Sequence, residues 1–460
     1  MKFFALLLLA SALALRSAFA DEPVTLTIEP QPNGYEIPAD FAGVSIFTGT
    51  QTRDHKGMPG NLFSGTNTQL ITIFENAGLH HLRLGATGSP NSGSPNLPHE
   101  DIDALFAFAR AAGIKVIYSL HYADGPATAK YVWDNYRPNL DYFAFDNEPD
   151  GRLKEDSGRA GGDYFITWRE FAASVVATVP GAKFAGPDAA GRTLVKRFVK
   201  AEKDSGNLAL VTQHTYVGGN SMKRGIDVPH AIESMLSVEW VTNNYPQLYR
   251  SVLEPVQKQG LPFRITELDD HVHGVTNASD SFASALWALD VMHWWAAHGA
   301  AGVNFQNTEW LRTDTFYLDT NRNYQMYPKG YGIRAFELGS HGRVATTEIE
   351  NPKSLNLTAY AVADSTNLFV TVINKEHGIG ARGAEVKIRA KNFVAATAGL
   401  MILKSATDDA GATNGITLGG TSMSNDKLWE GKWSALETST NGCTVKVPAT
   451  TAAVIRISAR

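Results

Sequence analysis

The sequence predicts an α/β fold, a (β/α)8 TIM barrel with an appended C-terminal β-sandwich domain. Between about residues 39 and 338, eight short apolar runs alternate with segments whose apolar residues recur at helical spacing. This alternation is typical of parallel strands joined by helices. From about residue 339 to residue 460 the helical spacing disappears, and short runs follow one another between Gly, Asn, Asp and Ser turns. That second pattern indicates a β-sandwich.

The segment 1–20 is typical of a secretory signal peptide. A charged start precedes roughly a dozen apolar residues, and Ala18-Phe-Ala20 forms a small-x-small cleavage site. We therefore expect cleavage after Ala20 and a secreted or periplasmic protein. A membrane anchor is the alternative, but the apolar run is short for a span and Arg16 interrupts it. In the segment 21–38, residues 24–28 alternate as a half-buried strand does, and we expect this strand to join the β-sandwich.

The strands follow in order along the chain. An open doubly wound sheet is the alternative to the barrel, but it usually has fewer strands, and no dinucleotide-binding or Walker loop follows any of them. Helical spacing recurs in 101–112, 163–178 and 281–298. The predicted barrel strands are 42–47, 80–84, 115–121, 142–147, 183–187, 209–216, 263–267 and 302–307. The predicted sandwich strands are 343–348, 357–362, 368–373, 385–388, 400–403 and 444–447.

Composition restricts the partners of the chain. The net charge of −5 shows none of the global basicity typical of nucleic-acid binders. Cys443 is the only cysteine, which excludes an intramolecular disulfide and a cysteine-rich zinc site. No segment after the first 20 residues reaches 18 uncharged apolar residues. We expect neither a nucleic-acid partner nor a membrane span after the signal peptide is removed.

Two glutamates stand where barrel enzymes carry their active residues. Glu148 follows the fourth predicted strand and Glu267 ends the seventh, and active sites of such barrels lie at the C-terminal ends of the strands. Retaining glycosidases need one carboxylic acid to protonate the departing oxygen and one carboxylate to attack the anomeric carbon. The pair predicts this chemistry, with Glu148 as acid/base and Glu267 as nucleophile. A helix cap or an ion pair is the structural alternative for each.

Other polar residues at the strand ends fit supporting roles. Asn147 can bind the 2-hydroxyl group of the sugar. Arg83 can lie near Glu267 and keep it ionised, although a structural ion pair is nearly as good an interpretation. Tyr216 can donate to the same carboxylate, and His214 can hold that tyrosine or contact the sugar.

The mechanism makes two physical demands. Glu148 must be protonated at the start of the cycle, so we expect its pKa to be raised. The two carboxyl groups must lie about 5–5.5 Å apart for a retaining enzyme. This chemistry requires no cofactor.

Five segments also carry a family resemblance. They are Leu82-Arg-Leu-Gly-Ala-Thr87, Asp146-Asn-Glu-Pro-Asp150, Ala185-Gly-Pro-Asp-Ala189, Gln213-His-Thr-Tyr216 and Ile265-Thr-Glu-Leu268. Over about residues 40 to 340 the chain resembles glycoside hydrolase family 79, the heparanase and β-glucuronidase family. The resemblance implies the same two catalytic glutamates, and a sandwich completed by an N-terminal strand.

The resemblance also implies a pocket for a sugar carboxylate, made by a Gly-rich turn after the nucleophile and a tyrosine beyond strand eight. Here the turn reads Asp269-Asp-His-Val-His-Gly274. Gly274 is its single glycine and Tyr317 the best match to the tyrosine. The two acidic residues are unusual neighbours for an anionic sugar. Ala86 also stands where the family usually has glycine.

Two further features near the site have competing interpretations. Asp269, Asp270, His271 and His273 could suggest a metal site, but their spacing matches no usual zinc pattern, so we expect no metal. Trp310, after strand eight, fits a sugar-stacking platform.

Together these observations predict a secreted retaining β-glycosidase. Its expected substrate is an oligosaccharide or polysaccharide that contains uronic acid and is therefore anionic. A glycosidase for a neutral sugar, such as a galactoside or a xyloside, is the alternative within the same fold. A non-catalytic glycan-binding protein is the alternative of another class, and the intact Asn147, Glu148 and Glu267 argue against it.

Overall fold

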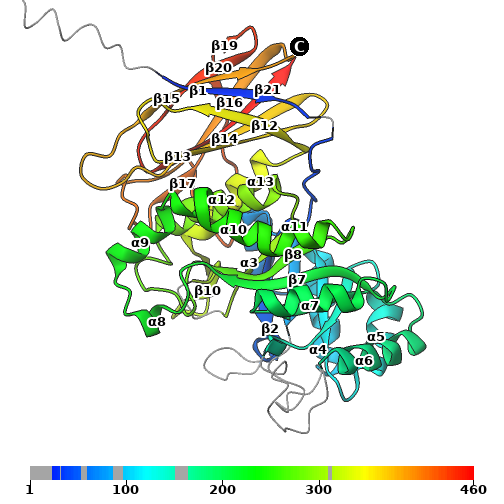
Figure 1. Cartoon of the computed structure of the whole chain (residues 1–460). Coiled ribbons are helices and arrows are strands. Elements are labelled where there is room, and N and C mark those ends of the chain that lie inside the picture. The colour runs from blue at the N-terminus through cyan, green and yellow to red at the C-terminus, as the bar shows by residue number, and fades with distance from the viewer. Residues whose placement is uncertain (1–22, 32, 53–59, 86–96, 151–163, 309–312) are drawn as a thin grey trace, which may run out of the picture.

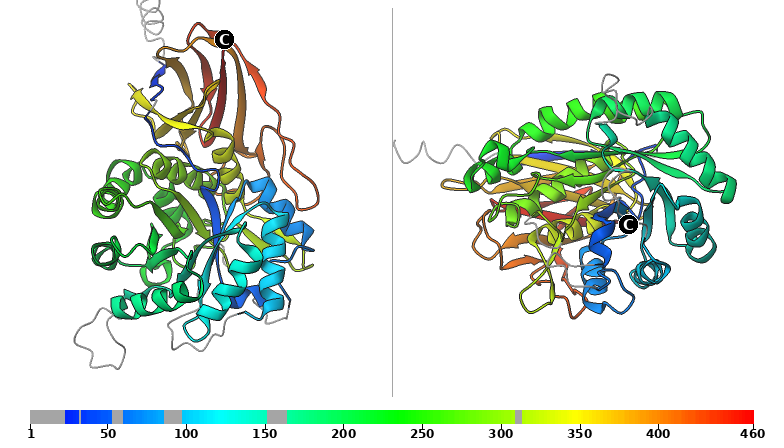
Figure 2. Two further views of the ribbon diagram at one scale, coloured as in Figure 1. Left: turned by 90° about the vertical axis from the view of Figure 1, so that its right-hand side faces the viewer. Right: turned by 90° about the horizontal axis from the view of Figure 1, so that it is seen from below.

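The computed structural model describes residues 23–31, 33–52, 60–85, 97–150, 164–308 and 313–460. The predicted signal peptide and Trp310 lie outside the described residues. The two domains lie one above the other in Figure 1 and in the left view of Figure 2. Among the helices described, none is long and apolar enough to cross a membrane.

The lower domain in these views is a closed barrel of eight parallel strands, as the sequence predicts. Each strand pairs with the next, and the last pairs with the first. The strands form because they are apolar runs buried on both faces. Every residue of Phe184–Ala189 and of Phe263–Asp269 is buried, for example. The barrel strands are β2 (Ala42–Phe47), β3 (His81–Gly85), β4 (Lys115–Leu120), β5 (Leu140–Phe145), β6 (Phe184–Ala189), β7 (Leu208–Tyr216), β8 (Phe263–Asp269) and β9 (Gly302–Gln306).

Helices cover the outside of the barrel (Figure 2). The connection between β7 and β8 is broken into several short helices and two π-helical turns, which the sequence pattern did not predict. The helices are α2 (Thr48–Thr52), α3 (Thr68–Ala77), α4 (His99–Ala111), α5 (Gly125–Tyr136), α6 (Tyr164–Thr178), α7 (Arg192–Glu202), α8 (Ser221–Arg224), α9 (Val228–Leu236), η2 (Trp240–Asn244), α10 (Tyr245–Leu248), η3 (Tyr249–Leu253), α11 (Glu254–Gln257), α12 (Phe282–Ala297) and α13 (Pro328–Gly339).

The upper domain is a β-sandwich whose two layers are joined through one strand. One end of β12 pairs with β13, and the other end pairs with β1 (Val24–Glu29). The blue β1 therefore lies among the yellow to red strands in Figure 1, as the sequence predicts. The remaining strands are β12 (Arg343–Glu350), β13 (Leu357–Ala363), β14 (Asn367–Asn374), β15 (Ala384–Ala390), β16 (Ala395–Ser405), β17 (Ile416–Leu418), β18 (Ser434–Leu436), β19 (Thr438–Ser439), β20 (Gly442–Val447) and β21 (Thr451–Ala459).

Period-two alternation builds the sandwich. In β15 the residues alternate strictly between buried and exposed, with Val386 and Ile388 inside and Lys387 between them outside. The inner faces of both layers meet in one core that includes Leu26, Val386 and Ile455. This packing gives the two layers a common dry interior.

The domains meet along α12 and α13. Because α12 is apolar on all sides and almost wholly buried, it belongs to the barrel and to the interface at once. Its Asp290 accepts hydrogen bonds from Thr358 and Tyr360, and pairs with Lys375 at 2.7 Å. All three partners are sandwich residues, so the two domains are fixed to each other by a satisfied buried polar cluster.

Several strands were not predicted from the sequence, among them β17, β18 and β19. A short hairpin, β10 (Phe316–Leu318) with β11 (Tyr324–Met326), follows the eighth barrel strand. The last strand, β21, lies between β14 and β16 in the middle of its layer.

Candidate active site

The structure brings Glu148 and Glu267 together at the C-terminal ends of the barrel strands. Glu267 lies within β8, and Glu148 follows the end of β5 by three residues. One carboxylate oxygen of each glutamate and a ring nitrogen of His214 all lie within 4.8 Å of one another. The Glu267 side chain is 3% exposed, whereas that of Glu148 is 40% exposed. Only Glu148 is therefore open to solvent.

The backbone around Glu148 is held in an uncommon conformation. Asp146, Glu148 and Asp188 have positive φ angles of 79°, 46° and 52°, a region that non-glycine residues rarely occupy. The Glu148 N–H donates to the Asp188 carbonyl oxygen at 2.9 Å, which ties the turn after β5 to β6. Such local strain persists where the surrounding structure enforces it, often at functional sites.

Arg83 connects five barrel strands or strand ends. Its Nε donates to Asp188 Oδ2 at 3.1 Å, and Nη2 donates to the same oxygen and to Asn147 Oδ1, both at 2.9 Å. Its Nη1 donates to Ser45 Oγ at 3.0 Å and to Glu267 Oε1 at 2.7 Å. All five N–H groups of the guanidinium thus have an acceptor.

The charge of Arg83 is well compensated although the side chain is fully buried. Burial alone lowers the pKa of Arg83, but the negative charges of Asp188 and Glu267 more than offset this and raise it. Space for the guanidinium comes from Gly85, since a Cβ there would lie 2.5 Å from Arg83 Nη1.

Tyr216 contacts the same carboxylate, as the sequence suggested. Its hydroxyl donates to Glu267 Oε2 at 2.9 Å. Burial and the nearby charge of Glu267 raise the pKa of Tyr216 well above its ordinary value, so the hydroxyl keeps its proton. Both oxygens of Glu267 therefore accept hydrogen bonds, which favours the ionised carboxylate.

His214 is placed between the two glutamates rather than against Tyr216. Its Nδ1 lies 3.0 Å from Glu148 Oε1 and 3.5 Å from Glu267 Oε2, and its Nε2 lies 3.7 Å from Asp188 Oδ1. Burial lowers the pKa of His214, but the charge of Glu267 and the interactions with Asp188 and Glu148 raise it to about 9. The ring is therefore protonated at neutral pH.

The expectation of a raised pKa for Glu148 is wrong for this state of the molecule. The hydrogen bond with His214 lowers the pKa of Glu148, and it outweighs the burial that would raise it. Glu148 is accordingly ionised, and the proton of the pair resides on His214.

Asp188 is a central residue to which the sequence analysis assigned no role. It lies in β6 and receives hydrogen bonds from Arg83 and from Thr266 Oγ1 at 2.6 Å. Burial alone would raise the pKa of Asp188, but the charges of Arg83 and His214 and the hydrogen bond from Thr266 lower it. The available signal was the Gly-Pro-Asp segment at the end of the fifth strand.

The two aspartates of the turn after Glu267 pair with groups inside the protein. Asp269 pairs with Lys329 of α13, and Asp270 accepts from Thr313 Oγ1 at 2.8 Å and from Ser279. Both aspartates are fully buried. Their carboxylates are thus directed into the protein and away from a bound sugar.

Gly274 and Tyr317, the predicted carboxylate-binding residues, have other contacts. The Gly274 N–H donates to the His271 carbonyl oxygen at 3.0 Å, which closes the turn. Tyr317 lies in β10 and stacks on Tyr327 with ring centroids 4.2 Å apart.

The residues that could hold a metal near this site are Glu148, His214 and Glu267 themselves, because their ligand atoms converge. The protonated His214 has no lone pair to offer at Nδ1. Arg83 and His214 together supply the positive charge that faces the carboxylates.

No family model and no curated protein matches the chain. Solved structures do match. A 4-O-α-L-rhamnosyl-β-D-glucuronidase from Fusarium oxysporum 12S is 14% identical with a TM-score of 0.70, covering 94% of this chain and 99% of that one. An arabinofuranosidase of family GH51 from Xanthomonas axonopodis pv. citri is 12% identical with a TM-score of 0.65, covering 95% and 99%.

A bifunctional glucanase-xylanase from a metagenome library is 15% identical with a TM-score of 0.62, again covering 95% and 99%. At these identities the likeness establishes the fold, a barrel with an accompanying β-sandwich. Membership of glycoside hydrolase family 79 stays a prediction.

Proposed function

We propose that the protein is a retaining β-glycosidase that works by double displacement. The observation that carries the proposal is the pair Glu148 and Glu267, with carboxylate oxygens no more than 4.8 Å apart at the catalytic end of the barrel. Carboxyl groups about 5–5.5 Å apart are typical of retaining enzymes, whereas inverting enzymes separate them by about 6.5–9.5 Å. The glycosidase descriptions of the similar structures support the same chemistry.

In the first step Glu267 attacks the anomeric carbon and forms a glycosyl ester, while Glu148 protonates the departing oxygen. In the second step Glu148 takes a proton from water, and the water oxygen replaces Glu267 on the sugar. Arg83 and Tyr216 keep Glu267 ionised and oriented for attack. The Asn147 side-chain oxygen accepts from Arg83, so its amide N–H groups are the ones that face the sugar 2-hydroxyl.

His214 holds the proton that the first step needs. Its Nδ1 lies 3.0 Å from Glu148, so the proton has only to cross that hydrogen bond. Formation of the ester then removes the charge of Glu267, which is the largest of the effects that raise the pKa of His214. The histidine and the acid/base residue therefore share one proton through the cycle.

For the substrate we propose a glycan that contains uronic acid, cleaved outside the cytoplasm after removal of residues 1–20. The similar glucuronidase supports this choice, and the inward-facing Asp269 and Asp270 remove the electrostatic objection to an anionic sugar. A neutral glycoside is the second candidate. It is favoured by Gly274, whose N–H is already bonded to His271 and does not point at a sugar carboxylate.

Hydrolysis of aryl β-glycosides by the purified protein tests the proposal, with glucuronide beside glucoside, galactoside and xyloside. We expect release from one member of the panel, and a product whose anomeric configuration is retained when followed by NMR. Glu267→Gln should lower the rate by about 10⁴-fold. Glu148→Gln should spare kcat/KM for substrates with a good leaving group but lower kcat, because the second step still needs Glu148 as base. Glu239→Gln, an exposed glutamate, is the matched control.

Each outcome has a distinct meaning. Release from the glucuronide alone supports the uronic-acid substrate, and release from a neutral glycoside replaces it. Full activity in Glu267→Gln contradicts the mechanism. Sugar binding without turnover on any glycoside or polysaccharide would indicate a glycan-binding protein instead.

A further inference from the structure

A groove on the outside of the barrel lies between α7 and the short helices that precede β8. There α7 packs beside η3 and α11 (Figure 1). The groove has a volume of about 290 Å³, close to the lower limit of about 300 Å³ for small-molecule pockets. The described residues that line it take no part in the candidate active site.

The floor of the groove is apolar. Val195 and Val199 come from consecutive turns of α7, and all of the valines in the floor are buried. Val252 of η3 and Val256 of α11 face them from the other side. Apart from Gln259, no uncharged polar side chain of the described lining could pair with the hydroxyl groups of a sugar, and no aromatic ring is there for a sugar to stack on. Burying a sugar here would therefore be unfavourable.

Three lysines form the rim of the groove. Lys196, Lys200 and Lys203 all line it, and no acidic side chain of the described residues does. Lysines cover apolar surface with their stems and keep the ammonium group in water, so these charges gather at the opening. Lys203 pairs with Asp204 at 2.8 Å. Lys196 and Lys200 have neither an ion pair nor a hydrogen bond among the described residues.

Helix stability does not explain this placement. Lys196 and Lys200 are four residues apart on one face of α7, where like charges repel and destabilise a helix slightly. The helix dipole favours a basic residue in the last turn, such as Lys200, but Lys196 is in the middle of the helix. Two uncompensated positive charges above an apolar floor are complementary to an anion that carries an apolar body.

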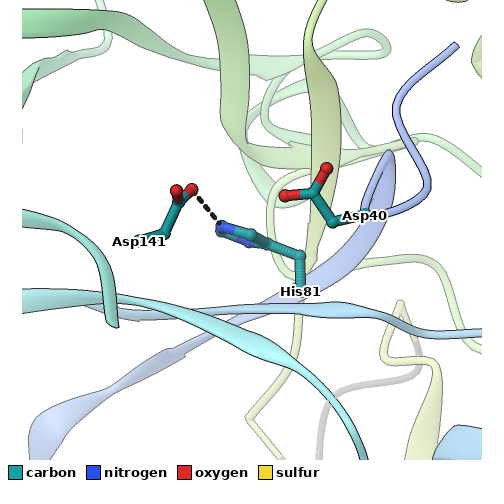
Figure 3. Close-up of side chains that lie close together, drawn as sticks. All are labelled: Asp40, His81 and Asp141. Atoms are coloured by element: carbon teal, nitrogen blue, oxygen red, sulfur yellow. Dashed lines mark ion pairs between the residues drawn. The ribbon is translucent and has the colours of Figure 1, made fainter. Parts of the chain in front are cut away.

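The charged groups at the base of the barrel, where the N-terminal ends of its strands lie, are arranged differently. Asp40 and Asp141 lie there on either side of His81 (Figure 3), and the charge of Arg264 acts on both carboxylates. Those negative charges face a positive one that the protein itself supplies. Around Lys196 no described residue does the same, so the counter-charge has to come from a ligand or from solvent ions.

We propose that this groove binds an amphiphilic anion, a carboxylate or sulfonate joined to a short alkyl chain or to an aryl body of about two fused rings. The apolar body lies on the valines of the floor, and the anionic group lies between the ammonium groups of Lys196 and Lys200. This binding is separate from the glycosidase activity and does not depend on it.

The charge of the ligand is tested with two fluorescent probes and the whole folded protein. We expect 8-anilinonaphthalene-1-sulfonate to bind at one saturable site, and N-phenyl-1-naphthylamine, which lacks the sulfonate, to bind more weakly. The double variant Lys196→Gln, Lys200→Gln should weaken sulfonate binding by about fivefold or more, because exposed ion pairs contribute about two- to fivefold each. Its affinity for the neutral probe should stay within about twofold. Lys446→Gln, at an exposed lysine of β20, is the matched control and should bind both probes as the unmodified protein does.

The apolar floor is tested by displacement of the sulfonate probe with hexanoate, octanoate and decanoate. Each buried methylene group contributes about 0.8 kcal/mol, so we expect the affinity to rise about fourfold per methylene until the groove is filled. Thermal unfolding of each variant confirms that it is folded, since the substituted lysines are exposed.

Several results would overturn the proposal. They are the absence of saturable sulfonate binding, an undiminished affinity in the double variant, or an equal loss in Lys446→Gln. An equal loss of the neutral probe in the double variant would show that the lysines support the groove rather than bind an anion. Displacement by polygalacturonate but not by decanoate would replace the amphiphile with an acidic polysaccharide.

Discussion

Two buried arginines, one near each end of the barrel, have opposite surroundings. Arg83 contacts the carboxylates of Asp188 and Glu267 at the catalytic end. Arg264 donates mainly to main-chain carbonyls at the base, those of Asp40, Phe41 and Ala301. The same side chain therefore organises reactive groups at one end and closes the barrel at the other.

Their electrostatics differ accordingly. Burial lowers the pKa of both arginines, but at Arg83 the charges of Asp188 and Glu267 reverse the effect and raise it. At Arg264 the charges of Asp40 and Asp141 do not offset burial, and the pKa is lowered. Burial alone does not distinguish a functional arginine from a structural one; the chemistry of its partners does.

Removing the catalytic arginine should have the largest effect. Arg83→Met removes one of the two positive charges that face the buried carboxylates of Asp188 and Glu267, and breaking such a buried pair costs about 3–5 kcal/mol. We expect kcat/KM to fall by at least about 1,000-fold, together with a lower Tm. Steady-state kinetics and thermal unfolding measure both. Arg343→Met removes an exposed ion pair with Glu36 and should change neither.

Removing Arg264, the buried arginine at the N-terminal end of the barrel, should lower stability without lowering activity. Arg264→Met leaves several buried carbonyl oxygens and Asn304 without a donor, at about 1–3 kcal/mol each. We expect Tm to fall markedly while kcat/KM of the folded enzyme stays within about twofold. A loss of kcat/KM like that of Arg83→Met would show that the two ends of the barrel are coupled. It would contradict the assignment of Arg264 to stability alone.

His214 should give stability a pH dependence that the groups at the N-terminal end of the barrel do not share. Its folded pKa of about 9 lies above the ordinary value of 6.5, so its stabilising contribution is complete below pH 6.5 and is lost as the pH rises to about 9. That contribution is on the order of 3 kcal/mol. Thermal unfolding between pH 6 and 10 should show the loss, and His214→Asn should flatten the curve.

His214→Asn also tests which group supplies the proton for the first step. The proton that the first step needs resides on His214, whose pKa is about 9. Because His214→Asn leaves that proton to Glu148 alone, this variant should move the alkaline limb of the kcat/KM profile to lower pH. At the base, burial lowers the pKa of His81, so its contribution is lost as the pH falls below 6.5 instead. An alkaline limb that stays near pH 9 in His214→Asn would contradict the shared proton.

Substitutions at Gly85 and Gly302, one beside each buried arginine, should have the smallest effects. A Cβ at Gly85 would lie 2.5 Å from Arg83 Nη1, and a Cβ at Gly302 would lie 2.4 Å from Arg264 Cζ. Both guanidinium groups are held by several hydrogen bonds and cannot move aside easily. Alanine at either site should cost about 1–3 kcal/mol. Gly85→Ala should also lower kcat/KM, whereas Gly302→Ala should lower only Tm.

The barrel was predictable because its strands are apolar runs with a regular rhythm, and their predicted bounds agree with the structure to within a few residues. β21 was not predicted, although its seven central residues include an apolar run, because it follows β20 after only a short turn. The broken helices between β7 and β8 share no single periodicity.

Within the candidate site, the sequence indicated which residues lie at the strand ends but not which ones touch. Arg83, Glu267 and Tyr216 meet as expected. The position of His214 beside Glu148, and with it the direction of the pKa shift, depends on side-chain geometry across neighbouring strands. The Gly-Pro-Asp segment placed Asp188 at a strand end, but its role depends on contacts with Arg83 and Thr266 that only the side-chain geometry shows.

The placement of β1 has a consequence for how the chain matures. This strand pairs with β12 and, in parallel, with β15, whose residues are made more than 300 positions later. During synthesis β1 is made before any barrel strand. It stays without its partner strands until the whole barrel has been synthesised. The sandwich is thus completed only when the C-terminal part of the chain pairs with the N-terminal strand. A protein truncated after α13 would lack β12 and β15, and β1 would have no strand to pair with.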